Sequence, residues 1–420
     1  MRFIMSAMNS ALYSAVSAIE PLLPTKVSSM DALLSKAHDL GRAATQLTGR
    51  VLLPELRQLL RSMNSYYSNK IEGQHTRPLE LEQALRKDFS TDLKLAKKQR
   101  LAVAHIEAEE AVEKRYVGEQ GAQALYTEAA ICDLHRELFT RLPPEDLFTE
   151  EGAPIAPGQL RQTEVSVGHH DGPTHDSVPA FLLRWGSFYQ NTRRGEATLV
   201  AMAAAHHRLA WIHPFRDGNG RVARLQTHAL LGALGYTAGL WSPLRGLARS
   251  TQDYYALLGA ADLPRQGDLD GRGNLSERAL VAWIDYFLDT CQDQVRFMAN
   301  LLDVTTMEQR IAAYLAFAAQ EPKSGVRMEV LRPLHYLFLT GGELERSHFK
   351  TMTGLQERTA SAALSALLKH GLLKSDTPLG KVRFALPLEA LRFYFPALWP
   401  EAEADVAAAA ASGTLWPHRR

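Results

Sequence analysis

HPFRDGNGRVAR, from His213 to Arg224, is the part of this chain that says most about its fold and chemistry. A histidine and an acidic residue precede a glycine-rich turn, Gly218 to Gly220, and the turn leads into RVARLQTHALLGALG, which has the pattern of a helix. A glycine-rich turn at a helix N-terminus presents backbone N–H groups and the positive end of the helix dipole, and this combination binds anions. The stretch therefore predicts a phosphate site, and a nucleoside triphosphate is the ligand that suits it best.

The residue types around this turn fit transfer of a nucleotide to a hydroxyl group. The unperturbed pKa of histidine is about 6.5, so neutral His213 can accept the hydroxyl proton near neutral pH. Asp217 offers the hard oxygen ligand that Mg²⁺ prefers. Gly218 and Gly220 lack a Cβ, so their backbone can approach phosphate oxygens. The Asn219 amide can donate to an oxygen on which negative charge develops.

The same stretch resembles a known family at every fixed position of its motif. The Fic-domain motif is H-x-F-x-[DE]-G-N-G-R-x-x-R, and EATLVAMAAAHHRLAWI resembles the helix that precedes the motif in that family. The resemblance implies an enzyme, a protein adenylyltransferase that moves AMP from ATP, with Mg²⁺, to a Ser, Thr or Tyr hydroxyl of a target protein. It also implies that Arg221 contacts the inner phosphates and Arg224 the γ-phosphate. Phe215 is expected to point into the core and anchor the loop.

The resemblance leaves part of the reaction open. Asp217 and both glycines are intact, which favours AMP as the group transferred. Transfer of phosphocholine or UMP stays open, because the motif binds phosphates and does not recognise the rest of the donor. Modification of the chain itself, and removal of AMP from the target, are also open.

A second pattern of the same family lies N-terminal to the motif. SNKIEG, Ser68 to Gly73, matches the inhibitory pattern [ST]-x-x-x-E-[GN]. The resemblance implies that Glu72 is placed against Arg224, where its carboxylate competes with the γ-phosphate for the guanidinium group. The chain is therefore expected to be self-inhibited, with Ser68 and Glu72 as the inhibitory residues.

Two further segments resemble functional parts of the family. Gly158 to Gly168 resembles the hairpin flap that pairs with the backbone of the target, a mode of binding that main-chain hydrogen bonds support. Within the flap, Gln162 to Val167 has β-strand composition. Tyr254 and Tyr255 resemble an aromatic pair near the nucleotide base, although two tyrosines on a helix are as often core residues. The residues expected to dock the target are Gln162, Thr163, Glu164 and Val165.

Composition restricts the class of protein. Hydrophobic residues make up 46% of the 420 residues and the net charge is +1, so no overall charge favours nucleic acid or membranes. The two cysteines, Cys132 and Cys291, are too few for a disulfide framework and fit a reducing compartment. Serine and asparagine residues interrupt the apolar N-terminus, and no segment has about 20 consecutive apolar residues. We therefore expect a cytoplasmic protein without a membrane span.

The hydrophobic periodicity predicts a mainly α fold. We expect a Fic helical bundle with a small β-hairpin flap, followed by a C-terminal winged helix-turn-helix. A helix is predicted from Leu52 to Asn69, ending near Gly73 and Pro78. The predicted divisions are an N-terminal helical region with the inhibitory helix (1–110), the Fic domain (111–300), the winged helix-turn-helix (301–400) and a tail (401–420).

The C-terminal region allows an alternative function. Between residues 343 and 383, seven basic residues stand against four acidic ones, a mild bias compatible with contacts to DNA phosphates. The alternative is thus a DNA-binding transcriptional regulator with a nucleotide-sensing Fic core. The intact His213 argues against a pure sensor, because binding of ATP requires no base. A homodimer stays open.

Overall fold

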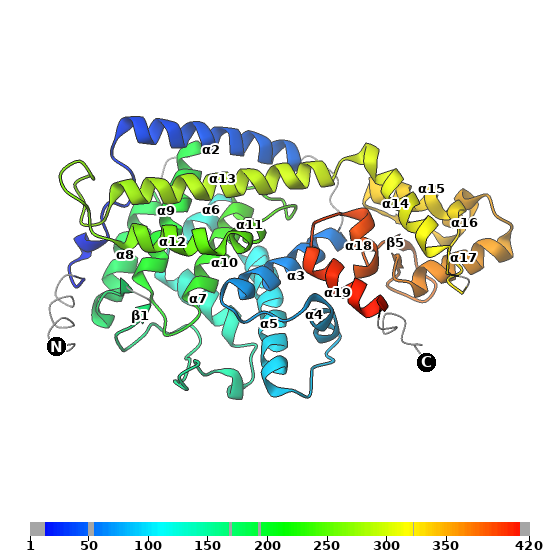
Figure 1. Ribbon diagram of the computed structural model, residues 1–420, viewed down its shortest axis with the longest axis horizontal. Coiled ribbons are helices and arrows are strands. Elements are labelled where there is room, and N and C mark those ends of the chain that lie inside the picture. The colour runs from blue at the N-terminus through cyan, green and yellow to red at the C-terminus, as the bar shows by residue number, and fades with distance from the viewer. Residues whose placement is uncertain (1–12, 49–53, 168–169, 192–194, 322, 412–420) are drawn as a thin grey trace. The chain divides into compact units, whose positions relative to one another are not determined.

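A computed structural model describes residues 13–48, 54–167, 170–191, 195–321 and 323–411 (Figure 1). The chain folds as two compact units. The first comprises residues 1–48, 64–76 and 89–296, and the second comprises residues 49–63, 77–88 and 297–420. Helices dominate both units, which agrees with the mainly α fold that the sequence predicts.

The core of the first unit is built around α9 (Glu196–Ile212). Every residue of this helix from Leu199 to Ile212 except Ala210 is buried, which places the helix in the centre of the unit. Its buried polar side chains, His206, His207 and Arg208, have hydrogen-bond partners. It packs against α2, α8 and α10. Its alanine-rich sequence allows this close approach of neighbouring helices. The helices of the unit are α2 (Val27–Thr48), α5 (Leu93–Arg115), α6 (Gly118–Ala124), α7 (Glu128–Phe139), α8 (Val178–Tyr189), α9, α10 (Asn219–Ala233), α11 (Leu244–Arg249), α12 (Thr251–Asp262) and most of α13 (Glu277–Leu301), with short 3₁₀ turns η1 (Val16–Ile19), η2 (Pro144–Asp146) and η3 (His175–Ser177).

Helix α3 (Pro54–Ile71) carries the inhibitory pattern at its C-terminal end. It corresponds to the helix predicted from Leu52 to Asn69, of which Leu52 and Leu53 lie outside the described residues. Gly73 follows the helix with a positive φ of 69°, and α4 (Pro78–Leu85) begins at Pro78. Gly73 thus ends helical geometry where the sequence predicts it, whereas Pro78 is the first residue of a new helix, a position at which its missing N–H costs no hydrogen bond. Residues 64–71 of α3 belong to the first unit.

The flap contains a very short hairpin. Strand β1 (Ser166–Val167) pairs antiparallel with β2 (His170–Asp171), with Ser166 opposite Asp171. The sequence favours a longer strand, from Gln162 to Val167. The Gly172 N–H still donates to the Val165 carbonyl, in continuation of the hairpin. The segment before Val165 is instead irregular, because the Thr163 carbonyl accepts a hydrogen bond from the Arg161 side chain.

The second unit follows the order of elements predicted for its C-terminal part. Strand β3 lies between helices α15 and α16, and a short turn joins α16 to α17. The strands form a small antiparallel sheet of order β3-β5-β4, in which β5 contacts α15 and β4 contacts α17. The assignment to the winged helix class stays a prediction, as does the division of the chain at residues 110, 300 and 400. The elements are α14 (Val304–Ala318), η4 (Met328–Val330), α15 (Leu331–Thr340), β3 (Glu343–Leu344), α16 (Arg346–Thr353), α17 (Glu357–Lys369), β4 (Leu373–Lys374), β5 (Val382–Phe384), α18 (Leu388–Tyr394) and α19 (Pro400–Ala411).

Within the described residues, no helix is both long enough and apolar enough to cross a membrane. Most of the apolar N-terminal segment considered above, residues 1–12, lies outside the described residues. The alanine-rich tail forms α19 as far as Ala411, and residues 412–420 are not described.

Candidate active site

His213 ends α9 in a left-handed backbone conformation, with φ at 51°. For a residue with a side chain this conformation costs roughly 1–2 kcal/mol, so the surroundings must hold it. The Arg161 side chain does so, because its Nε donates to the His213 carbonyl at 2.8 Å. The Arg161 N–H also donates to the Pro214 carbonyl at 2.9 Å. Two hydrogen bonds from one residue of the flap thus fix the corner that carries the histidine.

The imidazole of His213 has a defined tautomer. Its Nδ1 lies 3.3 Å from the carbonyl oxygen of Ala210, and since a carbonyl only accepts, Nδ1 carries the proton. The lone pair of the neutral ring is then on Nε2. Burial, with a smaller contribution from nearby His170, lowers the pKa of His213 to about 4. The ring is therefore neutral at physiological pH and able to accept a proton.

The loop after His213 is held by Asn219, the first residue of α10. Its Oδ1 accepts from the Phe215 N–H, and its Nδ2 donates to the Phe215 carbonyl, both at 2.8 Å. Phe215 is fully buried, as the sequence predicts. An amide nitrogen carries two N–H groups and Phe215 takes one of them. The contact of Asn219 with a phosphate oxygen stays a prediction.

Asp217 and Arg221 lie at the opening of α10. The Asp217 Oδ1 accepts from the Gly218 N–H and from the Arg221 Nη2, the latter at 3.2 Å. The Arg221 guanidinium lies over the ring of Phe139, 5.1 Å from its centroid. Gly218 has φ at 79°, and a Cβ there would stand 2.5 Å from the Phe139 ring. Only glycine fits this position of the turn.

Arg224 and the end of α3 form a buried, charged contact. The Arg224 Nη2 donates to the Glu72 Oε1 at 2.6 Å and to the Ser68 carbonyl at 3.1 Å, and its Nε donates to the Ser68 Oγ at 3.0 Å. The side chain of Arg224 is 1% exposed and that of Glu72 is 29% exposed. Burial raises the pKa of Glu72, but the guanidinium groups of Arg224 and Arg221 outweigh burial and hold this pKa below its ordinary value. The pair is thus charged at neutral pH, and the structure brings together the two residues that the inhibitory pattern pairs.

The Glu72 carboxylate also occupies space beside the glycine-rich turn. A Cβ built on Gly220 would stand 2.4 Å from the Glu72 Oε1 and 3.0 Å from the Arg224 Nη1. Gly220 lies in the first turn of α10, where the sequence predicts an anion site. In this structure a carboxylate of the chain itself lies at that site.

The two tyrosines of α12 have different surroundings. Tyr254 is 1% exposed, and its hydroxyl lies 3.1 Å from the His206 Nε2, so its ring is part of the core. Tyr255 is 46% exposed, and its hydroxyl donates to the carbonyl of Ile71, the last residue of α3, at 3.1 Å. Tyr255 thus holds the end of the segment that carries Glu72. Contact of either ring with a nucleotide base stays a prediction.

The predicted docking residues of the flap lie mostly on the surface. Gln162, Thr163 and Glu164 are exposed and Val165 is partly buried. The Glu164 Oε1 accepts from the His175 Nδ1 at 2.8 Å, which fastens the flap to the turn before α8. The main chain in this segment is part of an irregular loop, and its pairing with a target is not tested by the structure.

Two buried residues of this site, Arg161 and His135, are not among those predicted from the sequence. Arg161 is 5% exposed and His135 is 1% exposed. His135 follows Leu134 on the buried face of α7, with Ile131 and Leu138 one turn away on either side. A single polar residue on an apolar helical face is the signal that could have identified it, because a buried polar group needs a partner.

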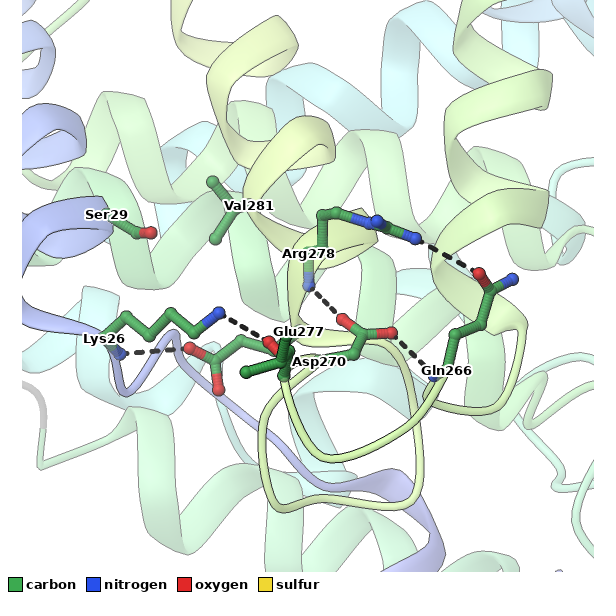
Figure 2. Close-up of a pocket in the computed structure, with 8 residues that line it drawn as sticks. Lys26, Ser29, Gln266, Asp270, Glu277, Arg278 and Val281 are labelled. Atoms are coloured by element: carbon green, nitrogen blue, oxygen red, sulfur yellow. Dashed lines mark hydrogen bonds between the residues drawn. The ribbon is translucent and has the colours of Figure 1, made fainter.

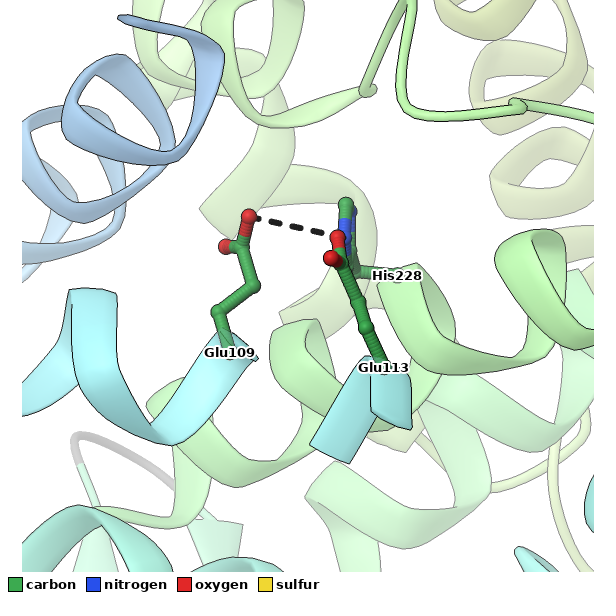
Figure 3. Close-up of side chains that lie close together, drawn as sticks. All are labelled: Glu109, Glu113 and His228. Atoms are coloured by element: carbon green, nitrogen blue, oxygen red, sulfur yellow. Dashed lines mark hydrogen bonds and ion pairs between the residues drawn. The ribbon is translucent and has the colours of Figure 1, made fainter. Parts of the chain in front are cut away.

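A group of metal-ligand side chains lies on another face of α10 (Figure 3). Glu109 and Glu113 of α5 face His228, and their ligand atoms all lie within 4.8 Å of one another. The His228 Nε2 is 2.9 Å from the Glu113 Oε1 and 3.5 Å from the Glu109 Oε1. The Asn64 Nδ2 donates to the Glu109 Oε1 at 2.9 Å, so this group also connects α5 to α3. Hydrogen bonds within the chain account for these contacts.

A cavity of about 150 Å³ lies near the start of α13 (Figure 2). Its carboxylates serve the main chain: Glu277 accepts from the N–H groups of Thr25 and Lys26, and Asp270 accepts from those of Gln266 and Arg278. These bonds fasten the segment before α2 and the loop before α13. The polar residues that line the cavity therefore stabilise the first unit. None of the lining residues is among those predicted to act on a nucleotide.

Comparison with known proteins bears on residues 125–231, which match the family model described as "Fic/DOC family". The protein adenylyltransferase Fic of Drosophila mojavensis is 32% identical over 124 residues, which are 29% of this chain and 23% of that protein. The protein of the same name from Drosophila grimshawi is 34% identical over 107 residues, 25% of this chain and 20% of that protein. The chain thus spans about a fifth of the length of these curated relatives.

A solved structure extends the likeness in fold beyond the matched segment. The crystal structure of a Fic family protein from Desulfovibrio desulfuricans G20 has a TM-score of 0.51 and 18% sequence identity. It covers 87% of this chain and 98% of that chain. The matched segment ends at Leu231 within α10, and so contains the whole stretch from His213 to Arg224. Residues 125–231 of this chain therefore match the Fic/DOC family.

Proposed function

We propose that this chain is a protein adenylyltransferase that is inhibited by its own Glu72. The observation that carries the proposal is the pairing of an intact motif, His213 to Arg224, with a carboxylate from α3 on the last arginine of that motif. The curated relatives named protein adenylyltransferase support the reaction, and the geometry of Arg224 supports the inhibition.

In the proposed reaction the Nε2 of His213 takes the proton of a Ser, Thr or Tyr hydroxyl. The hydroxyl oxygen then attacks the α-phosphorus of ATP, the bond to the β-phosphate oxygen breaks, and pyrophosphate leaves. The first turn of α10 supplies main-chain N–H groups and the helix dipole for the phosphates. Arg221 and Arg224 supply planar donors for phosphate oxygens.

Asp217 is the residue that fits Mg²⁺. Its Oδ1 accepts from the Gly218 N–H and from Arg221, so we assign Oδ2 to the ion. Mg²⁺ commonly binds through one carboxylate together with phosphate oxygens and waters, and when bound it neutralises charge on the phosphates. A single carboxylate at the end of the turn fits this mode of binding.

Inhibition follows from a competition for one guanidinium group. Glu72 and Ser68 together take the Nε and Nη2 donors of Arg224, which a γ-phosphate would need. The Glu72 carboxylate also lies beside Gly220, where the phosphates would approach the helix. ATP can therefore bind productively only after Glu72 has moved away.

The test compares the wild-type chain with two variants in transfer of label from ATP labelled on its α-phosphate, with a cell lysate as acceptor. We expect little labelling by the wild-type chain, strong labelling by Glu72→Gly, and none by Glu72→Gly combined with His213→Ala. Equal labelling by the wild-type chain and Glu72→Gly would contradict the inhibitory role. Label transfer that survives loss of His213 would contradict its role as the base.

The DNA-binding alternative has weaker support. Of the basic side chains in the second unit, Lys350 pairs with Glu357, Lys381 with Glu345, and Arg383 with Glu55 and Asp376. On α17 the exposed basic residues are Arg358 and Lys369. Paired cations contribute little to contacts with phosphates, so the enzymatic function remains our conclusion.

A further inference from the structure

His135 of α7 lies between the flap and the glycine-rich motif, two segments that are far apart in the sequence and for which the sequence predicts different functions. On one side is Gly158, the first residue of the flap, and on the other is Asp217 of the motif. The ring is stacked on Phe215, with centroids 4.0 Å apart and an interplanar angle of 16°, and Phe139 lies 4.5 Å away. The imidazole is thus fixed in its plane by aromatic neighbours.

The hydrogen bonds of His135 determine its protonation. The Gly158 N–H donates to Nδ1 at 2.8 Å, so Nδ1 carries no proton. The Nε2 lies 3.2 Å from the Asp217 carbonyl, which can only accept, so Nε2 carries the proton. With one nitrogen accepting and the other donating, the ring has this one tautomer. Each ring nitrogen is therefore committed to a different segment.

Both segments fit closely against the same surface of α7. A Cβ on Gly218, the residue after Asp217, would stand 2.5 Å from the Phe139 ring. A Cβ on Gly158 would stand 3.0 Å from atoms of the Arg136 side chain. The start of the flap and the glycine-rich turn therefore both pack against the residues of α7 around His135.

We propose that His135 is a positioning residue that sets the glycine-rich turn and the flap in register with each other. Its Nε2–H orients the peptide between Asp217 and Gly218, where the phosphates of ATP bind in the proposed function. Its Nδ1 holds the start of the flap, which the resemblance to the Fic family predicts to pair with the target backbone. The inference rests on the proposed function for its meaning, but the two hydrogen bonds can be tested without any transfer reaction.

Two substitutions separate the two bonds. In His135→Asn the Oδ1 takes the place of Nδ1 and can accept from Gly158, but nothing reaches the Asp217 carbonyl. In His135→Gln the Nε2 takes the place of the imidazole Nε2 and can donate to Asp217, but nothing accepts from Gly158. His135→Phe keeps the stacking on Phe215 and loses both bonds.

The experiment places each substitution in the Glu72→Gly chain and makes two measurements. The first is the Kd of a non-hydrolysable ATP analogue with Mg²⁺, by calorimetry. The second is the rate of amide hydrogen exchange in the flap, at Gly158 and the residues after it. Loss of one hydrogen bond should change the corresponding measurement by about tenfold.

We expect His135→Asn to weaken binding of the analogue about tenfold and to leave flap exchange within about twofold of the parent. His135→Gln should accelerate flap exchange about tenfold and leave the Kd within about twofold. His135→Phe should change both. If Asn and Gln alter both measurements equally, or alter neither, the proposal is wrong and His135 only fills space.

The Glu72→Gly chain without a change at His135 serves as the reference, and it separates failure of this inference from failure of the proposed function. If Glu72→Gly itself does not bind the ATP analogue, the proposed function fails. The flap measurement still decides for or against His135 in that case, because exchange does not depend on nucleotide.

Discussion

Replacement of Glu72 by glycine should raise the affinity for ATP by a factor that the contacts at Arg224 define. The Arg224 Nη2 and the Glu72 Oε1 are 2.6 Å apart, and the guanidinium is 1% exposed. A hydrogen bond to a charged group in such surroundings contributes about 1.5–3 kcal/mol. If ATP binds only when Arg224 is released from Glu72, about one in 10 to one in 150 of the wild-type molecules can bind ATP at any time. The apparent Kd of the wild-type chain for ATP is then higher by the same factor than that of a chain in which Arg224 is always free. The Glu72→Gly chain should therefore bind ATP about 10- to 150-fold more tightly than the wild-type chain.

The assay is calorimetric titration with a non-hydrolysable ATP analogue and Mg²⁺, on the wild-type chain and the variant. Glu72→Gln keeps the length of the side chain and loses its charge, so its Kd should fall between the two. Glu196→Gln is a matched control, because Glu196 is an exposed glutamate in the first turn of α9 that pairs with His38 and does not contact Arg224. Its Kd should equal that of the wild-type chain. A Kd for Glu72→Gly within about twofold of wild type, well below the shift derived above, would refute the competition at Arg224.

Three further predictions concern the base, the flap and the second unit. Burial lowers the pKa of His213 to about 4. The kcat/KM of the Glu72→Gly chain should therefore stay constant from neutral pH down to about pH 5 and decrease at lower pH, as the base becomes protonated. An inflection at about pH 6.5 would show an unperturbed histidine and would contradict this prediction. Arg161→Lys should lower AMP transfer about 10- to 100-fold, because one ammonium group cannot replace a guanidinium that donates to the carbonyls of His213, Thr163 and Pro173; transfer at the parent rate would contradict this role. In gel-shift experiments we expect the full chain to leave a short DNA duplex unshifted at physiological salt, whereas a shift that disappears in Arg358→Ala and Lys369→Ala would favour the DNA-binding alternative.

The sequence predicts the local elements of the site well, because they depend on short-range chemistry. The glycine-rich turn and α10 follow from Gly218 and the apolar period after it, and the end of α3 follows from Gly73. The contact between Glu72 and Arg224 was predicted as well, although 152 residues separate them. That prediction came from the resemblance, since neither residue alone indicates the other.

Other parts of the site depend on contacts that no local pattern encodes. The strand predicted from Gln162 to Val167 is mostly absent, because buried Arg161 takes the Thr163 carbonyl away from a ladder. The sequence also gives no sign that the Asn219 amide holds the main chain of Phe215, a role additional to the predicted contact with a phosphate. The pattern of α7 could have marked His135 as a buried polar residue, but it could not name its two partners, which come from segments 23 and 82 residues away.

The position of Glu72 on the same chain as Arg224 has a consequence for how inhibition responds to conditions. A tethered group acts on its partner at a fixed effective concentration, which does not change when the protein is diluted. An inhibitory glutamate supplied by a separate subunit would be lost on dilution. In the proposed function, by contrast, the active fraction is set by the concentration of ATP and by whatever displaces the end of α3, and we expect it to be independent of the protein concentration.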